Sequence, residues 1–171
     1  MTAADRPATD AVDVITAQWR EVNPGLDVSS MEVLARVFRI GDTVGARMTR
    51  AYGRYGLSRG EFDALSALRR AGEPYTLSPR ELAAATLLTT GGMTGRLDKL
   101  ERAGLLTRSP DPNDRRGLRV TLTERGLELT DEAAEAGLRV QREALAGLTP
   151  QQAAQLAALL RALVTSSERT G

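Results

Sequence analysis

The stretch TTGGMTGRLDKLERAG, residues 89–104, decides the fold. Read as a helix, it ends at Gly104, where a glycine just past a helix is favoured. Its first turn, residues 89–92, contains two glycines, although a glycine inside a helix costs about 1 kcal/mol relative to alanine. Small residues let a helix approach a phosphate or a base edge, so we interpret the segment as a DNA recognition helix. Its apolar stripe, which must face a core, consists of Met93, Leu97 and Leu100.

The neighbours of this segment complete a DNA-binding motif. Before it, the capping box that begins at Ser78 starts a helix that runs to about Ala85, and a short turn joins the two helices into a helix-turn-helix. After it, residues 105–109 and 118–122 are expected to form two strands around the turn-rich residues 110–117. That hairpin is predicted to be a wing.

Further amphipathic helices are predicted on both sides of this motif, at residues 10–22, 31–55, 60–71, 123–146 and 149–166. The fold class is therefore mainly α with a small β-hairpin. We expect four parts, which are a disordered tail at 1–9, an N-terminal extension with dimerisation helices at 10–56, the winged helix-turn-helix lobe at 57–122 and C-terminal dimerisation helices at 123–171. A single chain cannot bury the apolar stripes of its terminal helices, so we predict a homodimer formed through them.

Composition excludes several classes of protein. The 171 residues include no cysteine and no histidine, which removes thiol chemistry, the commonest metal ligand and the commonest general base. We expect no catalytic residues, no metal and no cofactor, and hence no enzyme. No apolar run is long enough for a membrane span or a signal peptide, so we expect a soluble, cytoplasmic protein. Basic residues outnumber acidic ones only in residues 86–126, the part that contains the helix-turn-helix and wing.

The residues expected to contact double-stranded DNA lie on the recognition helix and the wing. A two-fold dimer would carry two recognition helices to successive major grooves of a palindromic operator. Arg115 and Arg116 are expected to enter the minor groove or contact its phosphates, and the alternative is a solvated, charged turn. The expected contacts to the major groove and adjacent phosphates are Thr90, Gly91, Thr94, Gly95 and Lys99.

From residue 82 to residue 126 the chain resembles the MarR family of winged-helix regulators. The resemblance is carried by the helix 93–100 and by the motifs Glu101-Arg102-Ala103-Gly104-Leu105-Leu106, Asp111-Pro112-Asn113-Asp114-Arg115-Arg116 and Leu122-Thr123-Glu124-Arg125-Gly126. It implies a dimer formed by the terminal helices and a small anionic ligand that relieves repression.

A narrower resemblance, to the urate-responsive branch of that family, concerns an extra N-terminal helix and four residues. In that branch a tryptophan, an aspartate and two arginines line a crevice between the dimer helices and the DNA-reading lobe, and Trp19, Asp63, Arg96 and Arg108 match them in type. The resemblance implies that Trp19 stacks on or hydrogen-bonds the ligand and that Arg96 and Arg108 pair with its negative charge. Asp63 would be the negative group that the ligand displaces or recruits.

Each of these four residues also has a simpler interpretation. Trp19 is on an apolar helix face with Val12 and Ile15, where it could be a packing anchor. Asp63 could be an exposed acid at the start of a helix. Arg96 could contact DNA, and Arg108 could contact a phosphate or form a salt bridge within the lobe.

Our prediction is a repressor released from its operator by urate or a related purine or carboxylate. Three alternatives remain open: the same regulator responding to a phenolic or other aromatic acid, an architectural DNA binder without an effector, and an enzyme, which the missing histidine and cysteine disfavour. Four arginines on the outer faces of the helix at 31–55 are expected to face solvent: Arg36, Arg39, Arg47 and Arg50.

Overall fold

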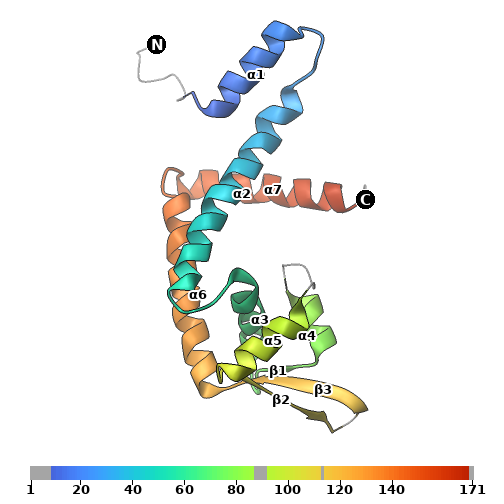
Figure 1. Cartoon of the computed structure of the whole chain (residues 1–171). Helices are drawn as coiled ribbons and strands as arrows, with labels where there is room; N and C mark the ends of the chain where they lie inside the picture. Colours follow the sequence, from blue (N-terminus) through green and yellow to red (C-terminus); the bar gives the residue numbers. More distant parts are fainter. Residues whose placement is uncertain (1–8, 87–91, 113, 170–171) are drawn as a thin grey trace. The chain divides into compact units, whose positions relative to one another are not determined.

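A computed structural model describes residues 9–86, 92–112 and 114–169 of the chain (Figure 1). The described elements are mainly helical and include one small sheet, as the sequence predicts. In chain order they are α1 (Ala11–Val22), α2 (Ser29–Gly53), α3 (Arg59–Arg70), β1 (Thr76–Leu77), α4 (Pro79–Ala85), α5 (Met93–Arg102), β2 (Leu106–Asp111), β3 (Asp114–Leu122), α6 (Glu124–Ala144) and α7 (Pro150–Glu168).

The chain divides into two compact units, residues 1–46 and residues 47–171. The first contains α1 and most of α2, and the second contains the end of α2 and every later element. Within the described residues, no helix is both long and apolar enough to cross a bilayer.

In the N-terminal unit, α1 buries a different stripe from the one that the sequence predicts. Val12 and Thr16 are each 1% exposed, whereas Ile15 is 44% and Trp19 is 42% exposed. Thr16 can be buried because its hydroxyl donates a hydrogen bond of 3.1 Å to the carbonyl oxygen of Asp13. The expected apolar face of Val12, Ile15 and Trp19 is therefore only partly correct, and Trp19 is not a buried packing anchor.

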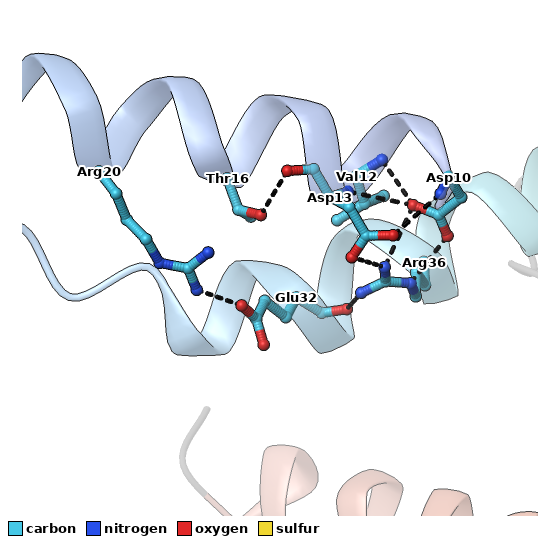
Figure 2. Close-up of polar contacts among 7 residues, drawn as sticks. All are labelled: Asp10, Val12, Asp13, Thr16, Arg20, Glu32 and Arg36. Atoms are coloured by element: carbon cyan, nitrogen blue, oxygen red, sulfur yellow. Dashed lines mark hydrogen bonds and ion pairs between the residues drawn. The ribbon is translucent and has the colours of Figure 1, made fainter. Parts of the chain in front are cut away.

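A polar clamp holds α1 against α2 (Figure 2). The guanidinium of Arg36 on α2 lies 2.9 Å from Asp10 Oδ2 and 2.6 Å from Asp13 Oδ1, and its Nη1 donates to the carbonyl oxygen of Glu32. A second ion pair joins Arg20 to Glu32. The expectation that Arg36 merely faces solvent is wrong, because α1 brings two carboxylates to it.

The clamp also accounts for the acidity of its carboxylates. The hydrogen bond from Arg36 holds the pKa of Asp10 below its usual value, and bonds from the α1 backbone add to this effect. For Asp13, the backbone hydrogen bond at Asp10 and then the bond from Arg36 lower the pKa. Both carboxylates are therefore charged at neutral pH, as an ion pair with Arg36 requires.

In the C-terminal unit a three-stranded antiparallel sheet has the strand order β1-β3-β2. Leu77 of β1 and Arg108 of β2 both pair with Val120 in the central strand. The sequence analysis did not include β1, whose two residues are too short to give a periodic signal. Helix α3 contacts α4, α5, α6 and β3 (Figure 1). The fully buried leucines and valine of this core are Leu65, Leu68, Leu82, Leu100, Leu106 and Val120.

The helix-turn-helix and the hairpin are present, with boundaries that differ from the prediction. Helix α5 begins only at Met93, because Gly92 before it has φ +79°, which is left-handed rather than helical. The prediction that Gly92 belongs to the first turn of the helix is therefore wrong. The wing strands reach Asp111 and Asp114, beyond the predicted ends at 109 and 118, and their pairing shifts register between Pro110 and Asp111, as at a β-bulge.

The segment after the wing explains the Leu-Thr-x-x-Gly motif in physical terms. Thr123 Oγ1 accepts from the backbone N–H of Gly126 at 3.0 Å, which caps α6, and donates to the carbonyl oxygen of Gly104 at 2.8 Å. A Cβ at position 126 would lie 1.9 Å from the carbonyl oxygen of Leu105. Only glycine allows α6 to start this close to the end of α5.

Candidate DNA-binding helix and effector site

The outward face of α5 is the candidate DNA-reading surface. Leu97 and Leu100 are buried beneath it, whereas Thr94, Gly95 and Lys99 are exposed. No atom lies within 4 Å of a Cβ built at Gly95, so packing within the chain does not require glycine there. Thr90 and Gly91, two further predicted contacts, lie outside the described residues.

Lys99 on α5 forms an ion pair with a buried carboxylate in the first turn of α3. Lys99 Nζ lies 2.8 Å from Oε1 of Glu61, whose side chain is 7% exposed. Glu61 Oε2 accepts from the backbone N–H of Ser58 at 2.8 Å in a capping box. Burial raises the pKa of Glu61, but the hydrogen bonds from Lys99 and Ser58 outweigh it, and the pKa lies below its usual value. Sequence reasoning missed Glu61, whose capping position gave no sign of the partner on α5.

Arg96, one turn before Lys99 on α5, packs against the backbone of the same α3 turn. A Cβ at Gly60 would lie 2.6 Å from Arg96 Nε and 2.9 Å from its Cζ. The guanidinium therefore occupies the space that any other residue at position 60 would fill. The sequence did not reveal this contact, because Gly60 has an ordinary helical position.

Asp63 is one turn further along α3 and is buried, with 9% of its surface exposed. The alternative of an exposed helix-start acid is therefore wrong. Its carboxylate is close enough to Tyr52 to add to the effect of burial, and both raise the pKa of that phenol. Tyr52 stacks on Phe62, with ring centroids 4.0 Å apart. Helix α3 thus carries Asp63 and contacts Arg96 of α5, and these are two of the four residues of the resemblance.

Arg108 has partners on α5. Its Nε donates to Glu101 Oε2 at 2.9 Å, its backbone N–H donates to Glu101 Oε1 at 3.0 Å, and its Nη2 lies 2.7 Å from Asp98 Oδ1. The hydrogen bonds that Arg108 donates to Glu101 and then to Asp98 raise the pKa of Arg108, and the bond to Glu101 lowers the pKa of Glu101. The salt bridge within the lobe, one alternative for this residue, is therefore present.

Trp19 belongs to the N-terminal unit, whereas Asp63, Arg96 and Arg108 belong to the C-terminal unit. Trp19 is 42% exposed, so part of its surface can contact another molecule. Among the described residues, no group of three acidic side chains could hold a metal ion.

The wing is linked to α4 through a residue that the sequence analysis did not select. Arg119 on β3 lies 3.5 Å from Glu81 and 3.8 Å from Asp111. The side chains of Arg115 and Arg116, the predicted minor-groove contacts, lie outside the described part of the structure. Arg119 therefore connects β3 to α4 through an ion pair with Glu81.

Comparison with known proteins identifies the family. A model of the MarR family matches residues 55–117. The HTH-type transcriptional regulator PecS of Dickeya dadantii is 36% identical over 149 residues, which cover 87% of this chain and 90% of PecS. The chain belongs to the MarR family. It is a DNA-binding transcriptional regulator and not an enzyme.

Solved structures of MarR-family proteins agree with this assignment. Bordetella bronchiseptica BpsR, whose DNA binding is regulated by 6-hydroxynicotinic acid, is 27% identical, with a TM-score of 0.67 over 78% of this chain and 98% of BpsR. A cysteine-to-serine mutant of Escherichia coli MarR in complex with operator DNA has a TM-score of 0.67 over 85% of this chain and 96% of that one. At 23% identity, that likeness shows the shared fold.

Proposed function

We propose that the chain is a repressor that binds a palindromic operator as a homodimer and is released by a small anionic metabolite, urate or a related purine or carboxylate. The proposal rests on the first two turns of α3. There Asp63 is buried, and Gly60 is in contact with Arg96 of the recognition helix. This arrangement connects a charged site to the DNA-reading element.

In this proposal, Thr94 and Gly95 meet base edges in the major groove, and Lys99 meets an adjacent phosphate. Lys99 has three N–H donors, and its exposed side chain can keep the ion pair with Glu61 while it meets a phosphate. Thr90 and Gly91 would extend the contact, and Arg115 and Arg116 would approach the minor groove.

Dimerisation is supported by apolar surface that the single chain leaves uncovered. Helix α7 buries none of its residues, and Leu159 and Val164 on it are 69% and 54% exposed. In the N-terminal unit, Phe38 and Ile40 are 68% and 59% exposed. Large exposed apolar side chains gathered on long helices are typical of subunit interfaces, and a two-fold dimer would present two recognition helices to one operator.

The effector would act through charge. Guanidinium groups suit planar anions because they are always protonated and donate in a fixed plane. An anion that pairs with Arg96 would draw its guanidinium away from Gly60. Trp19 would stack on the ligand, and Arg108 would join only if it exchanged Glu101 or Asp98 for the ligand. The ligand would then favour a state with lower DNA affinity.

An aromatic acid is the second candidate effector. BpsR, a relative in fold and sequence, responds to 6-hydroxynicotinic acid, which is a planar, anionic ring like urate. The same arginine chemistry would serve either ligand, so only a direct comparison separates them.

The test is a titration of the protein with a fluorescent duplex that contains its operator, selected from random DNA, and with a scrambled duplex. We expect tight, salt-dependent binding of the operator and release by urate at a lower concentration than by 6-hydroxynicotinate. Release by the aromatic acid alone would favour the second candidate. Equal binding of both duplexes with no ligand effect would favour an architectural protein instead.

A further inference from the structure

The Glu61–Lys99 ion pair joins the first turn of α3 to the recognition helix. Glu61 has a second contact that does not involve Lys99, because the Ser58 backbone N–H donates to Oε2 at 2.8 Å while Oε1 faces Lys99. The acceptor is buried, and Lys99 has 57% of its side chain exposed. A rigid, desolvated acceptor that receives a cation from another helix is suited to setting the position of that helix.

Packing beside this ion pair is incomplete. A hollow of about 210 Å³ lies between α5, α6 and the start of α3, and its lining includes Lys99 and Glu61 themselves. Its apolar lining residues include Leu57, Leu100, Leu105 and Leu129. The ion pair therefore lies beside this hollow, where it adds a polar contact between α3 and α5 to the apolar packing of the buried Leu100.

We propose that Glu61 is a positioning residue that holds α5 in its DNA-binding orientation through Lys99. The inference rests on the proposed DNA contact by α5 and is independent of the effector. A positioning role and a purely electrostatic role of Glu61 predict opposite changes in DNA affinity when its charge is removed. A carboxylate near DNA repels phosphates, so its removal should strengthen binding if Lys99 only contacted DNA, but should weaken binding if Glu61 positions the helix.

The decisive variant is Glu61→Gln, which retains an oxygen for the Ser58 cap and removes the charge. We expect operator affinity to fall about tenfold, within the usual range of coupling between elements, while affinity for a scrambled duplex changes less than about twofold. Operator binding that is unchanged or tighter would overturn the proposal. A substitution at the buried Glu61 can disturb folding, so variants of its exposed partner Lys99 provide a second test. Lys99→Met should lose the preference for the operator over the scrambled duplex, and Lys99→Arg should retain it. A Lys99→Met loss that is equal on both duplexes would overturn the positioning role.

A spectroscopic measurement tests the ion pair without DNA. Lys99 is the only lysine in the sequence, so reductive methylation with ¹³C-formaldehyde labels its amine and the N-terminal amine alone. We expect the dimethyl-Lys99 NMR signal to shift between the unsubstituted protein and Glu61→Gln, and an identical signal in both would overturn the proposal.

Thr94→Val, on the outward face of α5, separates this inference from the proposed DNA interface. If Thr94→Val leaves operator binding intact, the interface is wrong. The lysine signal then still decides whether Glu61 holds Lys99.

Discussion

The guanidinium of Arg96 lies where a side chain at Gly60 would be, since a Cβ there would be 2.6 Å from Arg96 Nε. Two neighbouring residues in the first turn of α3 thus contact α5. Gly60 leaves room for Arg96, and Glu61 forms an ion pair with Lys99. In the function proposed above, a ligand that pairs with Arg96 draws it away from this contact between the two helices.

Gly60→Ala should displace Arg96 and weaken the effector response. Alanine favours the helix by about 1 kcal/mol, so the thermal midpoint should hold or rise while the urate concentration for half-release of the operator increases about tenfold. Anisotropy of a labelled operator measures the release. Gly53→Ala is the matched control, because nothing lies within 4 Å of a Cβ there. An unchanged urate midpoint in Gly60→Ala would separate Arg96 from effector binding.

Gly95→Ala should have opposite effects on stability and DNA binding. The chain has open space for the methyl group, so the free energy of unfolding should rise by about 0.5–1 kcal/mol through helix propensity. Operator affinity should fall because the methyl group occupies the proposed approach of DNA. Chemical denaturation and operator anisotropy measure the two effects. A variant that is more stable and binds the operator equally well would remove Gly95 from the interface.

Arg36→Ala should release α1 from α2, because it leaves Asp10 and Asp13 without their cation. The only tryptophan, Trp19, is on α1, so its emission anisotropy reports the release directly and should decrease. Arg39→Ala is the matched control, since Arg39 is exposed on the same helix. If both variants retain the anisotropy of the unsubstituted protein, the clamp does not hold α1.

The same clamp predicts an acid-dependent step. Because folding lowers the pKa of Asp10 and Asp13, the stabilisation is complete above their unfolded values of about 4 and is lost as the pH falls through the lower folded values. Trp19 anisotropy, recorded from about pH 6 to about pH 2.5, should decrease in that acid range. Arg36→Ala should show a low anisotropy with no such step, and an identical step in that variant would assign it to other groups.

The elements with strong local signals were predicted from sequence. The capping boxes at Ser78 and Thr149 mark helix starts that the structure confirms, and the wing and the family assignment followed from short motifs. Contacts between distant residues were not predictable. The partners of Arg36, Gly60 and Glu61 come from other helices.

In the candidate site, too, residue types were predictable from sequence and contacts between distant residues were not. Residue types at four positions suggested an anion site, but neither the burial of Asp63 nor the Glu101 and Asp98 partners of Arg108 has a signal in a single sequence. Acidic residues at helix starts are usually exposed, and an arginine next to a turn usually meets solvent. Only the fold reveals which of these charges is already paired.

Gly126→Ala should be among the most destabilising single substitutions in the lobe. The added Cβ would lie 1.9 Å from the carbonyl oxygen of Leu105, which is backbone and cannot turn away. We expect the free energy of unfolding to fall by about 3 kcal/mol, measured by urea denaturation. Gly147→Ala, where the added Cβ meets nothing within 4 Å, is the control. Equal stability of the two variants would contradict the tight junction between α5 and α6.

The most direct test of the central claim follows Trp19 emission and operator anisotropy in one urate titration. We predict that the tryptophan emission changes and the operator dissociates with the same midpoint, and that Arg96→Gln moves both midpoints upward together. Release of the operator without a change in Trp19 emission would place the effector site elsewhere. No release at millimolar urate would contradict the account of a urate-responsive repressor.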